Sequence, residues 1–480
     1  MQNSSKTIIT NKHLFYFTVV LVSVLSGFAM VLPSPYNFIP FGVILGVVFI
    51  FTTFKYPMVG VYIYMFIFFF RPQEWTPLQI PYEKVIALVV ILTLFMYIAF
   101  KEKQFELYNI DKAYVAFMLV CLVSIIFSGD IGYSMDAYIE FAKIFLTYIF
   151  VSRIANTPKR FKSIMWLYVS SLIFLAVTTS YNYYTGGAQL SMGIDRARGL
   201  AGADGAYSDA NSVANSMVLG IPFLFFLMKY YKSTAMKLFF VAILAITCWT
   251  IILTGSRGGM LGVIIIMMIL AYQTSYRTIS MIGAFAFLAI FVVFMPSQYI
   301  ERFESIASVY DADDATGANE SAQGRIEGLE KGFVFMTERP LFGCGFQSFK
   351  WENRHQYGKW LDAHNFLGKL MGELGLMGLL TFGAFLYIII KTMQMLRYLY
   401  HKFKWEYDFE LAILDSFKYS FIMLGFQGLI GHNTYRFNWY IYACFIVAIT
   451  TIINRRVADQ ENKTETDNNQ IPDVVGIENI

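Results

Sequence analysis

The sequence TGSRGG at residues 254–259 places Arg257 between glycines, in a short loop that joins two apolar runs. A guanidinium at a membrane boundary is costly to place without an anionic partner, and its planar set of donors matches a phosphate. Glycines on either side let the backbone approach such a ligand closely. The loop therefore predicts a site for a phosphate-bearing ligand at the membrane surface.

A histidine and two further charged residues stand around the start of a later apolar run. His364 precedes this run, and Lys369 and Glu373 lie four residues apart inside it, on one helical face. A histidine at the mouth of a membrane span can serve as a general base near neutral pH, or it can cap the helix. Intramembrane charges are candidates for function, although a structural ion pair explains Lys369 and Glu373 equally well.

Composition places the chain in the membrane class. Of its 480 residues, 57% are hydrophobic and only 15% are charged, whereas soluble domains carry about 25% charged residues. The net charge of +4 comes from basic residues at the ends of apolar runs, so we expect no nucleic-acid partner. The four cysteines show neither a disulfide framework nor Cys/His metal spacing, and we expect no metal and no cofactor.

Apolar runs of spanning length predict an all-α polytopic membrane protein with about 12–14 transmembrane helices. The runs lie near 14–32, 37–54, 56–70, 83–100, 110–128, 137–154, 161–180, 212–231, 236–254, 259–273, 278–296, 365–390, 412–431 and 438–454. Four segments follow: residues 1–296 with spans and an outer loop at 181–211, residues 297–364 as a large outer loop between the eleventh and twelfth spans, residues 365–457 with the last spans, and residues 458–480 as a disordered tail. Within the large loop, apolar spacing from Ser321 to Arg339 predicts an amphipathic helix that lies on the membrane.

The loops differ in their basic residues on the two sides of the membrane. Basic residues mark alternate loops and both termini, which the positive-inside rule assigns to the cytoplasm, and these loops favour lysine. The other loops favour arginine, including Arg196, Arg198, Arg325 and Arg339. Because topology needs only positive charge, the choice of arginine indicates bidentate binding of anions. The alternative is that these arginines pair with carboxylates of the same loops.

Three segments together resemble the O-antigen ligase and polymerase superfamily of bacterial envelope membrane glycosyltransferases. Residues 254–259 are similar to the family's Ser-Arg loop. Gly324-Arg325 followed by RPLFGCG at 339–345 is similar to its periplasmic helix and glycine turn. Ala363-His364-Asn365 followed by Glu373, Gly375 and Gly378 is similar to its His-Asn and Glu-x-Gly-x-x-Gly stretch. The resemblance covers roughly residues 198–380.

The resemblance implies a glycosyltransferase that takes a glycan from undecaprenyl diphosphate at the periplasmic face of the inner membrane. The acceptor is lipid A-core in ligases, another repeat unit in polymerases, and a protein hydroxyl in the related O-oligosaccharyltransferases. By motif, His364 would be the catalytic base and Arg257 a ligand of the diphosphate, with Arg198 and Arg325 matching the diphosphate role less sharply. Supporting roles would fall to the remaining motif residues, which are Asn365, Glu373, Lys369, Arg196 and Arg339.

The chemistry of such a donor agrees with this set of residues. A lipid diphosphate is already a good leaving group, and arginines can stabilise its developing charge without a metal. Attack by the acceptor hydroxyl opposite the lipid would invert the anomeric carbon. The rival from another class is a transporter of lipid-linked sugars, which would favour inverted repeats and helices broken at the midplane. The sequence shows no such pairing.

Overall fold

The computed structural model describes most of residues 46–72 and residues 106–469. Gaps in these ranges fall at 47, 50, 54, 192–193, 201–206, 294, 296, 298, 301–316 and 432. The spans expected at 14–32 and 83–100, and most of that at 37–54, lie outside the described residues.

The chain divides into two units. The first comprises residues 1–67 and 80–103, and its described part holds most of the apolar helix α3 (Pro57–Phe70). The second comprises residues 68–79 and 104–480 and contains every residue proposed for the site.

The second unit is built from helices and one small hairpin. The helices are α6 (Asn109–Ser124), η2 (Ile125–Phe127), α7 (Ile131–Ile154), α8 (Pro158–Asn182), η3 (Tyr183–Gly187), α9 (Ala210–Tyr230), α10 (Thr234–Leu253), α11 (Arg257–Tyr272), α12 (Arg277–Val293), α14 (Gly317–Glu338), α15 (Phe349–Tyr357), α16 (Phe366–Lys402), α17 (Phe409–Leu429) and α18 (Phe437–Asn469). Strands β1 (Gln189–Ser191) and β2 (Ile194–Arg196) pair antiparallel, with Gln189 opposite Arg196.

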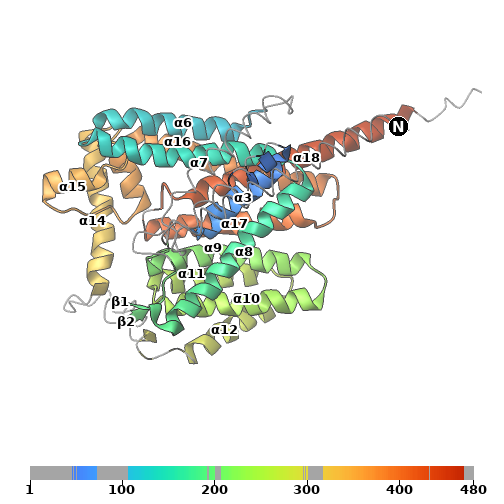
Figure 1. The fold of residues 1–480 in the computed structure, drawn as a ribbon, viewed down its shortest axis with the longest axis horizontal. Coiled ribbons are helices and arrows are strands. Elements are labelled where there is room, and N and C mark those ends of the chain that lie inside the picture. Colours follow the sequence, from blue (N-terminus) through green and yellow to red (C-terminus); the bar gives the residue numbers. More distant parts are fainter. Residues whose placement is uncertain are drawn as a thin grey trace, which may run out of the picture. The chain divides into compact units, whose positions relative to one another are not determined.

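Segments far apart in the sequence pack side by side in this unit. Helix α16 lies along α6, and α17 lies along α9 (Figure 1). Helix α14 crosses the ends of the long helices, where it packs against the start of α16 (Figure 1). The fold therefore brings residues from the 190s, the 250s, the 320s and the 360s to one end of the helices, which we call the site end.

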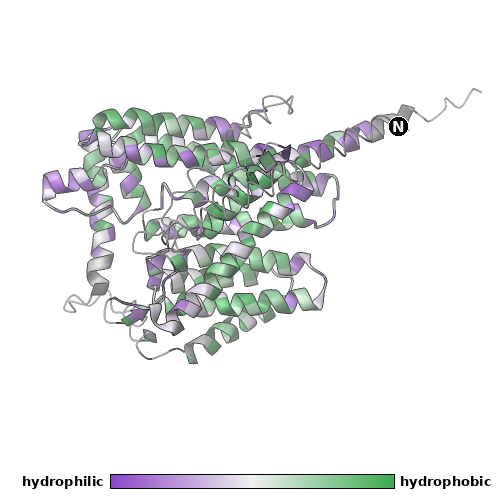
Figure 2. Ribbon diagram, in the orientation of Figure 1, coloured by the Kyte–Doolittle hydropathy of each residue, from purple (hydrophilic) through white to green (hydrophobic). Residues whose placement is uncertain are grey.

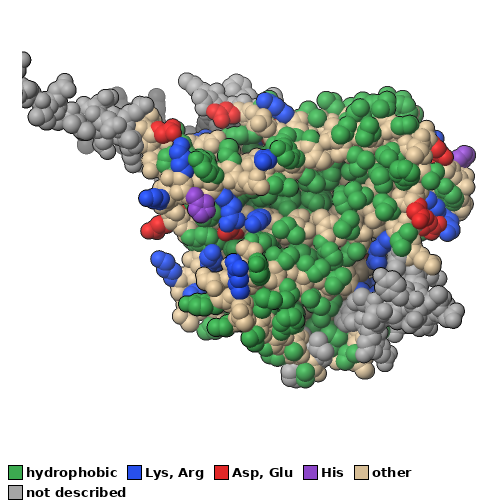
Figure 3. Space-filling model, turned by 180° about the vertical axis from the view of Figure 1, so that it is seen from behind, with side chains coloured by type: hydrophobic (Ala, Val, Ile, Leu, Met, Phe, Trp, Pro, Cys, Tyr) green, Lys and Arg blue, Asp and Glu red, His purple; other side chains and the backbone are tan. Residues whose placement is uncertain are grey.

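The all-α membrane class is confirmed. In the described part of the chain, six helices are long and apolar enough to cross a membrane: 109–127, 158–187, 210–230, 234–253, 366–402 and 437–462. Three shorter apolar helices cover 58–70, 257–272 and 277–290. The long helices are largely hydrophobic whereas α15 is hydrophilic (Figure 2). Hydrophobic side chains cover the middle of the face in Figure 3, with charged residues gathered at its two ends, as a lipid environment requires. The total of 12–14 spans remains a prediction.

Helix α14 occupies the segment whose apolar spacing predicted an amphipathic helix. Its apolar residues Ile326 and Phe333 are 60% and 55% exposed. Its buried face instead carries glycines, and a Cβ on Gly328 would clash with the carbonyl of Ala363 in the turn before α16. Because only glycine allows this approach, α14 and the first turns of α16 form one closely packed pair.

Helix α16 is broken, although the sequence indicated one continuous span. Gly375 has φ +60° and ψ −151°, outside the helical region. Four backbone hydrogen bonds to the 340–345 segment replace those lost at the break: Leu376 N–H to Pro340 O (2.8 Å), Met377 N–H to Leu341 O (3.1 Å), Cys344 N–H to Gly372 O (2.8 Å) and Gly345 N–H to Glu373 O (3.0 Å). The break is stable because protein, rather than water, satisfies the freed groups.

Helix α18 runs to Asn469. The part of the tail up to that residue, which we expected to be disordered, is therefore helical, and residues 470–480 lie outside the described residues.

Candidate functional site

His364 sits in a tight turn directly before α16. Its φ is +48°, a left-handed conformation that a residue with a Cβ adopts only when its surroundings impose it. Asn365 caps α16 by accepting hydrogen bonds from Leu367 N–H (2.9 Å) and Gly368 N–H (3.2 Å). Backbone strain of this kind clusters at functional sites, which supports a role for His364 beyond helix capping.

The C-terminal end of α17 joins the three motif segments. Arg325 of α14 donates from Nε to Ile430 O (3.0 Å), and Asn365 donates from Nδ2 to Leu429 O (3.2 Å). Gly258, at the start of α11, lies against the side chain of Ile430, because a Cβ there would be 2.7 Å from Ile430 Cδ1. The Arg257 loop, α14 and the His364 turn therefore surround one point of the fold.

The charges at this point raise the electrostatic potential. Burial lowers the pKa of the Arg325 guanidinium, and the positive charge of Arg257 lowers it further. Burial also lowers the pKa of His364, with Asp362 opposing the change and Arg325 adding to it. Cations that destabilise one another in a partly buried site are arranged to receive an anion.

Arg196 stabilises one side of the site. Its side chain is buried, and it donates from Nε to Thr254 O (2.7 Å) and from Nη2 to Asn211 Oδ1 (2.9 Å). These bonds tie β2 and the start of α9 to the loop that carries Arg257. Burial lowers the pKa of Arg196, Asp209 opposes this, and Arg257 adds to it, so its charge also contributes to the local potential.

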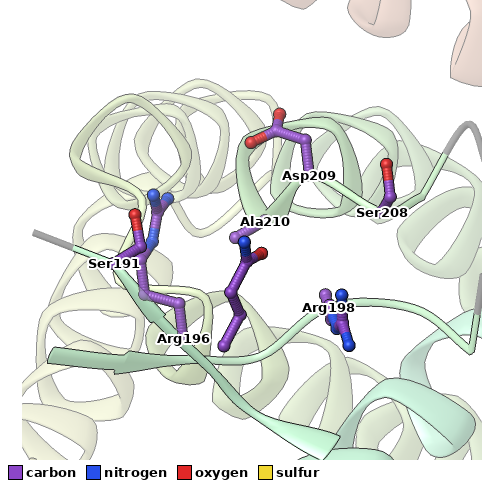
Figure 4. Close-up of a pocket in the computed structure, with 7 residues that line it drawn as sticks. Ser191, Arg196, Arg198, Ser208, Asp209 and Ala210 are labelled. Atoms are coloured by element: carbon purple, nitrogen blue, oxygen red, sulfur yellow. The ribbon is translucent and has the colours of Figure 1, made fainter. Parts of the chain in front are cut away.

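A hollow of about 310 Å³ lies between the hairpin and the start of α9. Figure 4 shows Arg196 and Arg198 on the hairpin side, with Ser208 and Asp209 across from them. The half-buried Arg198 donates from Nε to Gly187 O (3.3 Å). The lining also includes Gln189, Ser191 and Ala210. Because most of these side chains are polar, the hollow suits a hydrated ligand such as a sugar or phosphate group.

Lys369 and Glu373 are buried at the start of α16. The sequence left both a functional and a structural role open for them, and their partners distinguish the two. Lys369 Nζ lies 2.8 Å from Asp362 Oδ2 and 3.8 Å from Glu373 Oε1. Glu373 accepts hydrogen bonds from Tyr435 OH (2.8 Å) and from Phe349 N–H (3.2 Å). Both charges are therefore satisfied within the protein, which favours a structural role over direct catalysis.

The site brings together most, but not all, of the residues that the sequence singled out. His364, Arg257, Arg325 and Arg196 share one electrostatic neighbourhood. Arg339 instead is exposed, donates to Phe127 O (3.2 Å) and pairs with Glu352 (3.3 Å).

Sequence reasoning assigned no role to Asp362, Gln347 or Tyr435. Of these, only Asp362 carried a signal, since it stands two residues before His364. Gln347 and Tyr435 come from other segments, and only the fold brings them to Lys369 and Glu373.

Comparison with known protein families gives a match over part of the chain. No curated protein sequence matches the chain. Residues 240–383 match the family model described as O-antigen ligase. This match spans the Arg257 loop, α14, the His364 turn and the break in α16. The resemblance read from the motifs is thereby confirmed: across residues 240–383, this membrane protein carries the O-antigen ligase domain.

Proposed function

We propose that the protein is an O-antigen ligase-like glycosyltransferase that moves a glycan from undecaprenyl diphosphate to a hydroxyl of lipid A-core. The observation that carries this proposal is the convergence of Arg257, Arg325 and His364 at the end of α17. Two cations and a base in one partly buried place fit a diphosphate leaving group and an acceptor hydroxyl.

The mechanism follows from the roles that these side chains can fill. Neutral His364 accepts the proton of the acceptor hydroxyl as its oxygen forms a bond to the anomeric carbon. The bond from that carbon to the diphosphate breaks, and its electron pair stays on the departing phosphate oxygen. Arg257 and Arg325 stabilise the charge that develops there, with Arg198 as a further ligand next to the hollow. Attack from the side opposite the diphosphate inverts the anomeric carbon, and no step in this scheme uses a metal.

The remaining motif residues support this site. Asn365 fixes the start of α16, and Arg196 fixes the loop of Arg257. Arg339 holds the glycine turn against η2 and α15. The lysine distribution of the loops supports cytoplasmic termini and a site that faces the periplasm of a bacterial inner membrane.

A polysaccharide polymerase is the alternative within the same chemistry, because it differs only in its acceptor. A protein O-oligosaccharyltransferase is a further variant. The break in α16 is a specific feature that transporters share, since their substrate sites use interrupted helices. Here, however, the 340–345 segment fills the break with hydrogen bonds. This filling favours a fixed site over a transport pathway.

Complementation in a bacterial strain that lacks its own ligase tests the proposal. Wild type and the His364→Ala and Arg257→Ala variants are compared for protein level in the membrane and for surface glycan on a gel. We expect both variants to reach wild-type levels in the membrane and to lose transfer. Unattached long polymer identifies a ligase, whereas single attached units identify a polymerase. Full activity of both variants would overturn the proposed enzyme.

A further inference from the structure

Buried contacts fix the residues directly before and after His364. The preceding residue, Ala363, is fully buried, and its N–H donates to Asp362 Oδ1 (2.9 Å). Its carbonyl packs against Gly328 of α14. The following residue, Asn365, is held by the capping bonds and by Leu429 O. Such contacts supply what a left-handed histidine needs in order to persist.

A buried lysine supplies the contact that joins this turn to the rest of the site end. Lys369 Nζ donates to Asp362 Oδ2 (2.8 Å) and to Gln347 Oε1 (2.9 Å). Asp362 joins two partners: Oδ1 accepts from the backbone N–H of Ala363, and Oδ2 accepts from Lys369. The link runs from α16 through a single carboxylate to the residue next to His364.

Lys369 also lies near Glu373, which is itself bonded to two other segments. Glu373 lies one turn further along α16, and its two oxygens accept hydrogen bonds from Phe349 N–H at the start of α15 and from Tyr435 OH before α18. Lys369, Asp362 and Glu373 are each less than one-tenth exposed. Because buried charges tolerate little displacement from their partners, this set holds its geometry firmly.

We propose that the Lys369–Asp362 ion pair is a positioning device that holds His364 in its left-handed conformation and aims its imidazole at the acceptor hydroxyl. This inference rests on the proposed role of His364 as the base. Lys369 and Asp362 act through the turn and do not touch substrate, so they are positioning residues. The broken helix α16 contributes as well, because the 340–345 segment inserted there leads directly to Gln347 and Phe349.

The charges around His364 give the proposal a second readout. Among the described residues, the charged groups that act on the imidazole include Asp362 in its own turn, Arg325 from α14, Lys350 from α15 and Lys369 from α16. Burial, Arg325, Lys350 and Lys369 lower the pKa of His364, and Asp362 raises it. Removing the charge of Lys369 therefore raises the pKa of His364, and the acid limb of the pH–rate profile moves to higher pH.

The test compares two buried lysines of the same region in purified, membrane-reconstituted protein. Lys331 of α14 is also buried, with partners Glu327 (2.8 Å) and Asn353 (2.7 Å). Asn353 reaches the chain before the turn only through Leu361 O (2.8 Å), and neither partner bonds to Asp362 in the described residues. The variants are Lys369→Met, Lys369→Arg, Asp362→Asn and, as the matched control, Lys331→Met. Each is assayed for thermal stability, for kcat and KM with a lipid-diphosphate glycan donor, and for the pH dependence of kcat/KM.

We expect Lys369→Met and Asp362→Asn to lower kcat by about 10²-fold with little change in KM for the donor, because a misplaced base costs rate and not binding. Lys369→Met also moves the acid limb upward, and Lys369→Arg recovers much of the rate. Lys331→Met lowers stability but leaves kcat and the pH profile unchanged. If Lys369→Met does not accumulate in the membrane, the kcat of Asp362→Asn provides the test. This variant keeps the side-chain shape and the acceptor for Ala363 N–H.

Two results would overturn the inference. One is a Lys369→Met protein whose kcat and acid limb match those of Lys331→Met. The other is an Asp362→Asn protein with wild-type kcat. A wild-type protein that transfers no glycan, or a fully active His364→Ala variant, contradicts the proposed function instead, so the two failures are distinguishable.

Discussion

The two ends of the helical unit treat their arginines differently. At the end opposite the site, three arginines pair with carboxylates. Arg153 pairs with Asp111 and both are buried, while Arg397 lies 2.7 Å from Asp415. Arg456, on α18, lies 2.6 Å from Asp408 before α17. Charge is neutralised locally there, and the ion pairs connect neighbouring helices.

At the site end, Arg339 pairs with Glu352, but the arginines near His364 contact backbone carbonyls and lie close to further positive charge. Arg196 and Arg325 donate to Thr254 O and Ile430 O, and the charge of Arg257 opposes both guanidiniums. A carbonyl orients a guanidinium but does not cancel its charge. The comparison teaches that the same residue type joins helices through ion pairs at one end and, at the other, orients loops through backbone carbonyls next to further positive charge.

Removing the proposed base at the site end should have the largest effect on glycan transfer. We expect His364→Ala to lower glycan transfer by about 10²–10⁴-fold, because general base catalysis contributes about that much. The matched control is His401→Ala, an exposed histidine near the opposite end of α16, which should retain wild-type rate. Single-turnover transfer by purified protein measures both. Equal rates in the two variants would refute the role of His364.

Substituting arginines at the two ends sharpens the comparison. Arg257→Ala and Arg325→Ala should each lower kcat by about 10²–10³-fold, since each removes a donor to the developing phosphate charge. Arg456→Ala should lower the thermal stability of the protein and leave kcat near that of wild type, because its partner Asp408 is structural. Transfer rates and melting temperatures of the three variants are measured together. A loss of rate in Arg456→Ala equal to that in the others would remove the distinction.

Packing at the site end offers a smaller and purely steric test. Gly328→Ala places a Cβ against Ala363 O and should destabilise the protein by about 1–3 kcal/mol, with a loss of transfer as the His364 turn shifts. Gly324→Ala, one turn earlier on the same helix, meets no atom of the described residues within 4 Å and should be neutral or slightly stabilising. Thermal unfolding in detergent compares them. Wild-type stability and activity in Gly328→Ala would contradict the close packing of α14 on α16.

The pH dependence should show the smallest effect. His364 must be neutral to accept a proton, and burial lowers its pKa from the usual value near 6.5. The acid limb of kcat/KM should therefore lie below pH 6.5. Lys350→Gln removes one of the charges that lower this pKa and should move the limb to higher pH. The pH–rate profiles of the two proteins test this, and a limb that Lys350→Gln leaves in place would show that the limb belongs to another group.

The sequence predicted the helices well because an apolar run of spanning length favours a helix by itself, without help from distant segments. Every run expected from residue 110 onward coincides with a helix, from α6 to α18. The family match covers residues 240–383, which include Arg257, Arg325 and His364, and the roles of these residues stay predictions. Both signals are carried by residues close together in the chain.

Features that depend on distant segments could not be predicted in this way. The break at Gly375 exists because the 340–345 segment replaces the lost helical hydrogen bonds. The structural role of Arg196 depends on Thr254 and Asn211, which only the hairpin fold brings near. Lys369 looked like half of an ion pair with Glu373, but its shorter contact is to Asp362, outside the helix.

Binding of undecaprenyl diphosphate tests the central claim most directly. Purified wild type, Arg257→Gln, Arg325→Gln and Arg397→Gln are reconstituted in nanodiscs, and their affinities for the radiolabelled lipid are compared. The account predicts that each of the two site-end variants binds about 10-fold or more weakly, since a charge-assisted hydrogen bond contributes at least about 1.5 kcal/mol. Arg397→Gln should bind like wild type. Wild-type affinity in both site-end variants, or an equal loss in a folded Arg397→Gln protein, would contradict it.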